Sequence, residues 1–512
     1  MSGSDRLAGG LMVCGTSSDS GKTTLVTGLC RVLARRGLKV APFKGQNMAL
    51  NSMVVASGAE IGRAQAAQAE AAGVEPEAAM NPILLKPSGN HTSQVIVMGR
   101  PWASLDARAY QEVKTEMWPV VTSALADLRT RFDAVICEGA GSPAEINLLE
   151  HDLVNLRLAR HAELPALLVG DIDRGGVFAS IFGTLALLPH DLGGCIRGIV
   201  INKFRGDRSI LSPGLEDLEH RTGVPTLGVL PWLEGVDFDS EDSLALRRLH
   251  REIHARREGS VVDVAAIAFP HISNFTDLDA LALEPDVNVR LVEHPGDLRQ
   301  PDLLVLPGTK STLADLDWLK ETGLAGAITE LVGQGSNPPV VLGICGGYQM
   351  LGERIEDAVE SPKPRVAAGL GLLPVSTIFQ PTKITERQAG IAFGQTVTGY
   401  EIHHGRTASS EPWIRLGDTG GNPRHEGSST RDRRILGTSL HGLLESDAFR
   451  HAFLADIAGR AGRTRTPTRV SFNAARQARY DRIADAVEEH LDVATVERLI
   501  KEASIGEGHT GS

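Results

Sequence analysis

The sequence predicts an α/β protein with two doubly wound domains followed by C-terminal helices. Short apolar runs alternate with longer helical patterns, which is typical of parallel strands joined by crossover helices. The 55 glycines cluster beside these apolar runs, and this placement favours phosphate loops and tight turns. A chain of 512 residues, of which 42% are hydrophobic, is long enough to bury more than one core.

The first domain is expected over residues 1–238. Its strands are predicted in the runs LMVCGT, KVAPFK, FDAVICEGAG, ALLVGDID, RGIVINKF and TLGVLPWLEG, with helical patterns such as LVTGLCRVLARRG between them. The chain then becomes charged, so residues 239–260 are predicted to link the two domains. Within this linker one helical face would carry Leu246, Leu249 and Ile253.

The second domain is expected over residues 261–448. Its strands are predicted in VDVAAIAFP, VNVRLVEH, DLLVLPGTK, PVVLGICGG and ILGTSLHGLLE, and glycine, threonine and turn residues dominate before the last of these. Residues 449–512 are predicted to form a helical extension that ends in a frayed tail. Its apolar face would consist of Ile483, Val487, Leu491, Val496, Leu499 and Ile500.

Composition and charge exclude several classes of function. A formal net charge of −11 and 4% aromatic residues provide no basic stripe or stacking surface for nucleic acid. The five cysteines have no paired spacing, which disfavours a metal cluster or a disulfide framework. No apolar run approaches the roughly 18 residues that a membrane span needs, and the N-terminus lacks a leader pattern. We therefore expect a soluble, cytoplasmic protein.

A glycine-rich loop, GTSSDSGKTT at residues 15–24, follows the first predicted strand and precedes a helical pattern. Backbone N–H groups of such a loop converge on a phosphate, Lys22 can reach the β- and γ-phosphates, and Thr23 can bind Mg²⁺. The alternative is a glycine turn that only caps a helix. The sequence predicts an ATP site formed by Thr16, Ser17, Ser18, Asp19, Ser20, Gly21, Lys22, Thr23 and Thr24.

Three acidic residues are candidates for the metal at this loop. Glu138 ends an apolar strand in VICEGAG, at the edge where α/β proteins bind ligands, and it is the first candidate together with Thr23. Asp171 and Asp173 follow another strand in LLVGDIDRGG and are rivals, although a strand-end aspartate is also a common helix cap.

A cysteine lies between a predicted strand and a predicted helix in VVLGICGGYQM. Such an elbow exposes a nucleophile, and Gly343, Gly346 and Gly347 supply the room that the sharp turn needs. The helix N-terminus lowers the pKa of the Cys345 thiol, and the next N–H group can help to bind an oxyanion. The other four cysteines lie in apolar runs and are interpreted as small core residues.

A thiol nucleophile also needs a base. Among the 16 histidines, His441 ends an apolar strand and is the best candidate. His403 and His404 compete, but adjacent strand residues point to opposite faces, so at most one of them could approach the thiol. Gly308, in LPGTK at the end of another strand, could donate a second backbone N–H to an oxyanion.

The motif G-x-C-x-G-x-Q, with a strand-end histidine about a hundred residues later, resembles the glutaminase domain of class I amidotransferases. The resemblance implies that the thiol attacks the glutamine amide, forms a glutamyl thioester and releases ammonia, with Gly308, Gly346 and Gln349 at the glutamine site. Most members continue as H-x-E, whereas Gly442 and Leu443 follow His441 here. We therefore expect a Cys-His dyad, since Glu445 could orient the histidine only through a sharp turn.

Segments of the N-terminal half narrow the resemblance further. The phosphate loop has five residues between its glycines instead of four and resembles that of dethiobiotin synthetase-like ATPases. The segments FKGQNMALNS, GAEIGRAQAAQA, MNPILLKPSGNHTSQVIVMG and VGDIDRGGVFAS resemble the cobyric acid synthase family, and the similarity spans nearly the whole chain. The fold implied is a P-loop NTPase-like domain followed by a class I amidotransferase-like domain.

This resemblance implies ATP-dependent amidation of the b, d, e and g carboxylates of adenosylcobyrinic acid a,c-diamide. It further implies ATP, Mg²⁺ and L-glutamine, no tightly bound prosthetic group and a small-molecule corrinoid as the partner, while a homo-oligomer stays open. The residues that match family segments near the acyl-acceptor side are Lys44, Gln46, Asn47, Arg63 and Gln65. The alternatives are a solvated strand-end lysine for Lys44 and a helix-surface charge for Arg63.

Two other functions compete with this interpretation. Cobyrinic acid a,c-diamide synthase shares the domain order and the glutaminase motif, but it carries an acidic residue where Gln46 and Asn47 stand here. A partitioning-type ATPase fused to a glutaminase-like binding module is the alternative from another class. Cys345 argues against it, because a binding module has no use for a thiol on a strained elbow.

Overall fold

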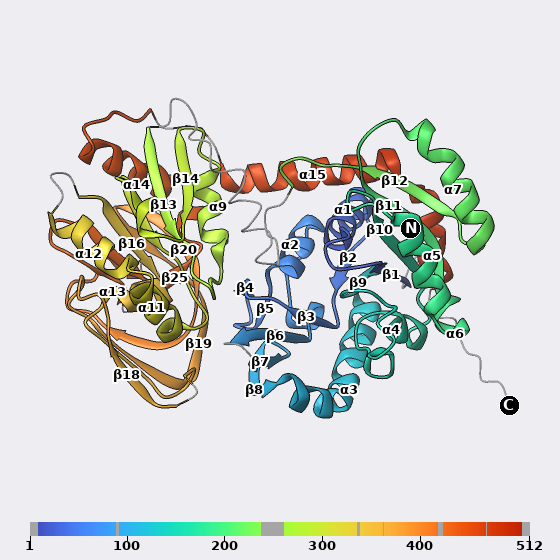
Figure 1. Ribbon diagram of the computed structural model, residues 1–512, viewed down its shortest axis with the longest axis horizontal. Helices are drawn as coiled ribbons and strands as arrows, with labels where there is room; N and C mark the ends of the chain where they lie inside the picture. The colour runs from blue at the N-terminus through green and yellow to red at the C-terminus, as the bar shows by residue number, and fades with distance from the viewer. Residues whose placement is uncertain are drawn as a thin grey trace.

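The computed structural model describes residues 9–88, 92–236, 261–334, 338–361, 363–417, 423–466, 468–469 and 471–503. Two lobes lie side by side, and the long helix α15 (Phe472–His490) spans from one lobe to the other (Figure 1). The predicted linker, residues 239–260, and the predicted tail lie outside the described residues. None of the described helices is long and apolar enough to cross a membrane.

The first lobe is built on a six-stranded parallel sheet in the order β12-β11-β10-β1-β9-β2. Every strand predicted for this domain is present. The strands are continuous apolar runs because helices cover both faces of the sheet. Their bounds are β1 Gly9–Gly15, β2 Val40–Phe43, β9 Ala134–Glu138, β10 Ala166–Asp171, β11 Ile196–Phe204 and β12 Thr226–Pro231.

Two cores flank this sheet, and alternate strand residues point into each. Met12 packs with helices of one layer, and Val13 packs with α1 and the C-terminal helices of the other. The helices of the lobe are α1 Lys22–Arg35, α2 Arg63–Ala71, α3 Ala107–Arg131, α4 Leu156–His161, α5 Val177–Leu187, α6 His190–Gly193 and α7 Arg208–Thr222, with short 3₁₀ turns η1 Ala78–Met80 and η2 Leu149–His151.

Two small sheets extend this lobe toward the second one (Figure 1). The sequence analysis did not predict these two sheets. One is a hairpin of β4 (Ser52–Val54) and β5 (Glu60–Gly62). The other has the order β3-β6-β7-β8, with β3 Gln46–Met48, β6 Ile83–Ser88, β7 Thr92–Val97 and β8 Arg100–Asp106.

The second lobe also has a six-stranded sheet, in the order β14-β13-β15-β16-β24-β23, parallel except for β23. Its strands are β13 Val262–Ile267, β14 Val287–Val292, β15 Leu303–Leu306, β16 Val340–Ile344, β23 Ser428–Ser429 and β24 Ile435–Thr438. The helical elements around it are η3 Phe275–Leu278, α9 Asp279–Ala282, α10 Pro295–Leu298, α11 Thr312–Glu321, α12 Leu324–Gln334, α13 Gly346–Leu351, η4 Leu443–Glu445 and α14 Asp447–Arg460.

A second, mainly antiparallel sheet in this lobe is built on the long hairpin of β19 (Ser376–Ala392) and β20 (Gln395–Ala408). From the sequence this region was expected only to be rich in turns. The sheet is completed by β17 Arg354–Asp357, β18 Arg365–Ala368, β21 Ile414–Leu416, β22 Arg424–Glu426 and β25 Leu440–His441.

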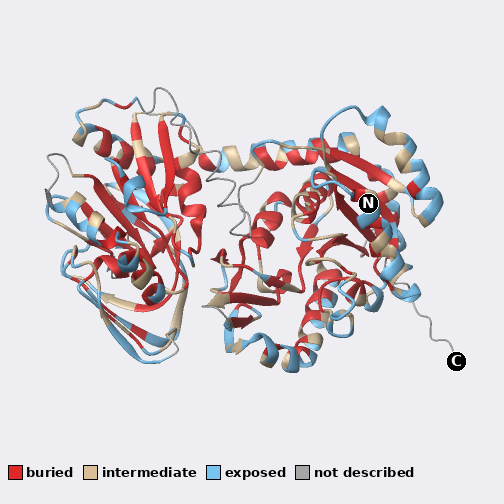
Figure 2. Cartoon of the chain, viewed as in Figure 1, coloured by how far each residue is buried: buried red, intermediate tan, exposed pale blue. Residues whose placement is uncertain are grey.

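The C-terminal helices α15 and α16 (Val493–Glu502) return to the first lobe. Figure 2 shows the buried side of α15 against that lobe. A Cβ on Gly28 of α1 would lie 2.6 Å from Val487 Cγ2 and 3.0 Å from Ile483 Cγ2, so the two helices pack closely. The apolar face predicted from the sequence is confirmed, because all six of its residues are buried: Ile483, Val487, Leu491, Val496, Leu499 and Ile500.

Candidate functional site

The phosphate loop joins β1 to α1 at the carboxyl end of the parallel sheet. Gly21 takes a φ of +98°, and a Cβ on Gly15 would lie 2.1 Å from Ser20 Oγ, so the turn requires both glycines. Lys22 Nζ donates to the carbonyls of Ser17 and Gly141 at 2.9 and 3.1 Å. The remaining loop residues are partly or fully exposed: Thr16, Ser18, Asp19, Thr23 and Thr24.

Two residues that the sequence analysis missed support this loop from the end of β11. Asn202 Nδ2 donates to Ser20 O at 2.9 Å. Lys203 Nζ donates to Asp19 O at 2.5 Å and to Asp171 Oδ2 at 2.8 Å. The segment INKF gave no signal of this contact, because the loop lies about 180 residues earlier in the chain.

Glu138 lies at the centre of a buried cluster beside the loop. Its Oε1 accepts from Thr23 Oγ1 at 2.9 Å and from Lys44 Nζ at 3.0 Å, and its Oε2 accepts from Gln68 Nε2 at 2.6 Å. Burial alone would raise the pKa of Glu138, but Lys44 and the hydrogen bonds hold it below its usual value. An ionised carboxylate beside a hydroxyl fits Mg²⁺, which takes such oxygens together with phosphate oxygens and water.

The rival carboxylates lie in other surroundings. Asp171 is bonded to Lys203, and Asp173 is close to Arg205 with its side chain 44% exposed. Asp171 Oδ1 also accepts from the Asp173 backbone N–H at 2.9 Å, which stabilises a turn and is not the helix cap considered for a strand-end aspartate, because the next helix begins at Val177. Of the three carboxylates, only Glu138 accepts a hydrogen bond from the Thr23 hydroxyl in the part of the chain that the structure describes.

Cys345 lies on the elbow between β16 and α13, with φ 50° and ψ −107°. This left-handed conformation costs about 1–3 kcal/mol and is held by the surrounding backbone. Cys345 N donates to Thr438 O at 2.7 Å, and a Cβ on Gly347 would lie 1.9 Å from Leu306 O. The elbow predicted from the sequence therefore needs glycine where it approaches β15.

His441, at the end of β25, lines the same cavity as Cys345, and its Nδ1 ring nitrogen contacts a carboxylate. Nδ1 of His441 lies 2.7 Å from Asp277 Oδ2, and the Gly442 N–H donates to Asp277 Oδ1 at 2.7 Å. The expectation of a dyad without a carboxylate is therefore wrong. Asp277 lies in the 3₁₀ turn η3, 164 residues before the histidine, so no local motif could identify it.

The charges of this triad favour a thiolate beside an imidazolium. Burial would lower the pKa of His441, but Asp277 and Cys345 raise it to about 10. Burial would raise the pKa of the Cys345 thiol, but the hydrogen bond and charge of His441 lower it below its usual value. In contrast, burial raises the pKa of Cys137 to about 12. The same cause raises the pKa of Cys14 and Cys30, as expected for core cysteines.

The other proposed histidines and Glu445 have different partners. Both His403 and His404 border the cavity that contains Cys345, although regular alternation would place only one of them there. The pairing of β19 with β20 shifts register opposite these histidines, and the shift breaks the alternation. Glu445 does not reach His441 through a sharp turn but accepts from Arg63 Nη2 at 3.1 Å.

The residues expected at the glutamine site surround the elbow. A Cβ on Gly308 would lie 2.8 Å from His441 Cε1, and a Cβ on Gly346 would lie 2.6 Å from Thr309 Cγ2. Gln349 is buried, and its Oε1 accepts from Thr312 Oγ1 at 3.1 Å. All three positions predicted from the sequence therefore adjoin the Cys345–His441 pair or the wall of its cavity.

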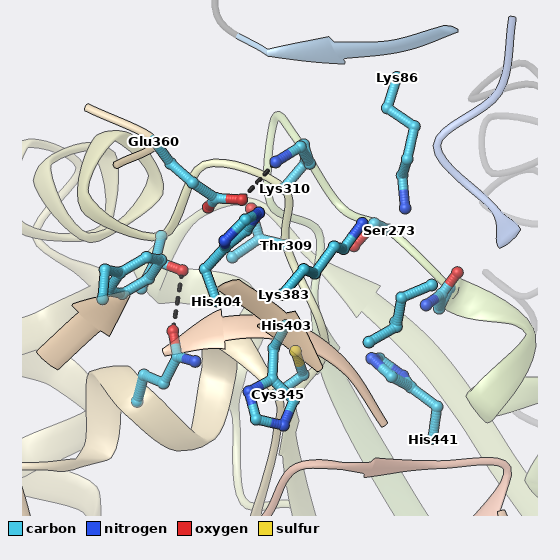
Figure 3. A pocket seen from close by; sticks show the side chains of 15 residues that line it. Lys86, Ser273, Thr309, Lys310, Cys345, Glu360, Lys383, His403, His404 and His441 are labelled. Carbon is cyan, nitrogen blue, oxygen red and sulfur yellow. Dashed lines mark hydrogen bonds and ion pairs between the residues drawn. The ribbon is translucent and has the colours of Figure 1, made fainter. Parts of the chain in front are cut away.

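A cavity opens above the elbow (Figure 3). Most of its lining comes from the second lobe, but Lys86 comes from β6 of the first lobe. It is lined by Lys86, Ser273, Asn274, Thr309, Lys310, Thr312, Cys345, Gln349, Glu360, Phe379, Lys383, Ile402, His403, His404 and His441. The thiol therefore faces a chamber at the boundary between the two lobes.

The boundary itself is held by polar contacts of the β4–β5 hairpin. Ser52 N donates to Asn274 Oδ1 at 2.9 Å, and Tyr400 Oη donates to Ser52 O at 3.1 Å. The Tyr400 ring also stacks on His441 with centroids 5.5 Å apart. Glu60, which is fully buried, accepts from Lys86 of its own lobe and from Lys383 of the other lobe. These contacts join the hairpin to the walls of the thiol chamber.

The five candidate substrate residues are mostly buried and bonded to protein groups. Asn47 Nδ2 donates to Gln65 Oε1 at 2.9 Å, and Gln46 Oε1 accepts from Tyr110 Oη at 2.6 Å. Lys44 and Arg63 are each 4% exposed, so the alternatives of a solvated lysine and a helix-surface charge are wrong. Lys44 is the ion-pair partner of Glu138, which places it in the buried cluster beside the phosphate loop.

Comparisons with known proteins agree with this arrangement. The family described as a CobQ/CobB/MinD/ParA nucleotide binding domain matches residues 11–245. The family described as a CobB/CobQ-like glutamine amidotransferase domain matches residues 263–449. The two matches cover the two lobes in the predicted order.

Curated relatives resemble the chain over nearly its whole length. The cobyric acid synthase of Frankia casuarinae is 51% identical, and the match covers 97% of this chain and 98% of that protein. That of Streptomyces avermitilis is 51% identical, with 97% of each chain covered. That of Geobacillus thermodenitrificans is 47% identical, with 96% of this chain and 98% of that protein covered. The chain belongs to the cobyric acid synthase family.

Proposed function

We propose that this glutamine-dependent amide ligase amidates the b, d, e and g carboxylates of adenosylcobyrinic acid a,c-diamide, using ATP and ammonia from glutamine. Membership of the family supports an ATP- and glutamine-using amidation in cobalamin biosynthesis. The identity of the acceptor and the four carboxylates that become amides go beyond what family membership supports, and they are what we propose. The observation that carries it is the Cys345–His441–Asp277 triad in a chamber that Lys86 of the ATP-binding lobe helps to line.

In the ATP-binding lobe, the carboxylate of the acceptor attacks the γ-phosphorus of ATP, ADP leaves, and an acyl phosphate forms. A carboxylate is a poor acyl donor, and phosphorylation supplies the leaving group. Lys22 offsets the charge that accumulates between the two anions, while Thr23 and Glu138 would hold Mg²⁺. When bound, Mg²⁺ supplies further charge neutralisation at the phosphates. The buried Lys44 keeps Glu138 ionised for this purpose.

In the second lobe, the Cys345 thiolate attacks the carboxamide carbon of glutamine. The N–H groups near Gly308 and Gly346 would bind the oxyanion, and the His441 imidazolium gives its proton to the departing nitrogen, which leaves as ammonia. Water then hydrolyses the glutamyl thioester, with His441 as the base, and glutamate leaves. Ammonia attacks the acyl phosphate, and the amide forms as phosphate departs. Release of ammonia into a cavity that Lys86 of the ATP-binding lobe helps to line would favour its use over its loss to solvent.

Mass spectrometry of the acceptor tests the proposal directly. Adenosylcobyrinic acid a,c-diamide incubated with the protein, Mg-ATP and glutamine is expected to gain four amides in steps, and the control without glutamine is expected to gain none. Amidation of cobyrinic acid in place of the a,c-diamide would indicate the a,c-diamide synthase activity. Failure to amidate either compound would overturn the proposed acceptor.

Three variants separate the two half-reactions. Cys345→Ala and His441→Ala are expected to lose use of glutamine and to keep amidation with added ammonium salts. Lys22→Ala is expected to lose amidation with both nitrogen donors, because activation of the carboxylate is lost. Ammonium-dependent turnover by Lys22→Ala at the wild-type rate would contradict the role of the loop.

A further inference from the structure

We infer that Lys310 and Glu360 recognise the α-carboxylate and the α-ammonium group of the glutamine that the chamber admits. The inference rests on the proposed glutaminase role of Cys345, and it adds the residues that select the donor molecule. Lys310 and Glu360 form an ion pair in the wall of the chamber, with side chains that are 7% and 16% exposed. Figure 3 shows this pair on the side of the chamber away from His441.

The chemistry of glutamine calls for such a pair. Its reactive carboxamide is separated from a zwitterionic end by two methylene groups, so a donor site needs a thiol at one end and both charge signs at the other. A buried ion pair presents both signs of charge, and Lys310 and Glu360 satisfy each other. A bound zwitterion would add its ammonium to the carboxylate of Glu360 and its carboxylate to the ammonium of Lys310.

The other charged side chains that line the chamber form ion pairs with carboxylates outside its lining. Lys86 and Lys383 both bond to Glu60, which lies outside the lining. His403 is within 3.5 Å of Glu401. Among the described lining residues, Glu360 is the one carboxylate, so it is the chamber group that can bind a ligand ammonium by charge. Its charge also reaches the thiol, since it is among the groups that act to raise the pKa of Cys345.

Both side chains are positioned by rigid surroundings. Asp357, at the end of β17, accepts from the N–H groups of Val359 and Glu360 at 2.8 Å each, and from the N–H of Ser361 at 2.9 Å. These bonds fix the turn that carries Glu360. The backbone N–H of Lys310 donates to His271 O at 3.0 Å. Lys310 is also only two residues from Gly308, where a Cβ would lie 2.8 Å from His441 Cε1. The pair is therefore preorganised relative to the elbow.

Donor analogues that lack one charged group test each residue separately. The assay is ammonia release from L-glutamine, from glutaramate, which lacks the ammonium, and from 4-aminobutanamide, which lacks the carboxylate. Glu360→Gln is expected to lower kcat/KM for glutamine by about 30-fold or more while changing little with glutaramate. Lys310→Met is expected to lower kcat/KM for glutamine similarly while changing little with 4-aminobutanamide.

A matched control is Asp317→Asn, which breaks the exposed ion pair with Arg365 on the same lobe and is expected to leave donor selectivity unchanged. Ammonium-dependent amidation reports whether each variant is folded, and Glu360→Gln carries the test if Lys310→Met fails to fold. Equal losses with all three donors, or unchanged kinetics with glutamine, would overturn the inference. Glutamine hydrolysis that persists in Cys345→Ala would instead refute the proposed function itself, so the two failures are distinguishable.

Discussion

At the scale of single residues, the charge state of the Cys345–His441 pair decides when the thiol can attack. The pKa of His441 is raised to about 10 and that of Cys345 is lowered, so a thiolate beside an imidazolium is favoured over a wider pH range than an isolated thiol would allow. Since only the thiolate is nucleophilic, glutamine hydrolysis should fall as the pH drops through the pKa of Cys345. Asp277 contributes by stabilising the imidazolium at 2.7 Å.

Asp277→Asn tests this contribution. Loss of the negative charge lowers the pKa of His441, which weakens its support of the thiolate and raises the pKa of Cys345. The acid limb of the pH profile of kcat/KM for glutamine should move to higher pH, and kcat should fall by about 10²-fold or more. Ammonium-dependent amidation serves as the control and should persist. An unshifted acid limb would mean that Asp277 does not set the charge of the pair.

Glu138→Gln tests the proposed metal site. The substitution removes a charge that Thr23 and Lys44 contact, and it leaves the buried Lys44 without its counter-charge. Ammonium-dependent amidation, titrated with Mg²⁺, should drop by about 10²-fold or more and need more metal. Asp173→Asn, which alters a rival carboxylate that is 44% exposed, should keep the wild-type metal dependence. If Asp173→Asn instead needed more Mg²⁺ and Glu138→Gln did not, Asp173 would be the better candidate for the metal ligand.

At the scale of elements, close backbone approaches define both the elbow and the joint between the lobes. Gly347 allows α13 to approach β15, and Gly28 allows α15 to lie against α1. A side chain at either position would meet atoms closer than van der Waals contact permits. These glycines therefore have a packing role in addition to any effect on backbone freedom.

Gly28→Leu should separate α15 from α1. The added side chain collides with Val487 and Ile483, and overpacking of this kind costs about 1–3 kcal/mol. We expect a lower Tm and faster limited proteolysis near residues 461–471. The matched control is Gly183→Ala in α5, where a Cβ meets nothing within 4 Å and helix propensity favours alanine by about 1 kcal/mol. Equal Tm shifts in both variants would contradict the packing argument.

The sequence predicted the parallel strands, the phosphate loop, the elbow and His441, because each is a local pattern of apolar runs, glycines and one polar residue. It could not predict Asp277, which reaches His441 across 164 residues. It also missed the β4–β5 hairpin, whose two strands have three residues each. Lys44 and Arg63 were named as substrate-binding candidates, which stays a prediction, and their ion pairs with Glu138 and Glu445 could not be foreseen because these partners are far away in sequence.

At the scale of the whole molecule, helix α2 has contacts toward both reaction centres. Gln68 bonds to Glu138 beside the phosphate loop, while Arg63, about one turn earlier, bonds to Glu445 in the turn that follows His441. Buried charges such as Glu60 and Lys383 also pair across the boundary. Separating the lobes would break the Glu60–Lys383 and Arg63–Glu445 ion pairs, so the lobes are expected to move as one body.

The proposed division into residues 1–238, 239–260, 261–448 and 449–512 carries a prediction about truncation. Removal of residues 449–512 strips six large apolar side chains from the core around α1. Each is worth roughly 1.5–3 kcal/mol, a sum comparable with the stability of a whole domain. We expect the 1–448 fragment to aggregate or to bind hydrophobic dyes, as measured by light scattering and fluorescence. Co-expression of residues 449–512 should restore solubility, whereas a soluble, monodisperse fragment would contradict this dependence.

The return of α15 and α16 to the first lobe also fixes the order in which the cores can close during protein synthesis. The last strand of the first sheet, β12, ends at Pro231, but the helices that cover its α1 face begin at Phe472. At about 5–20 residues per second, a ribosome needs roughly 15 to 50 s to make the intervening chain. During that interval Leu29 and Leu33 of α1 lack their final cover. The half of the protein that is made first is therefore completed last, and the nascent chain exposes an apolar surface suited to chaperone binding.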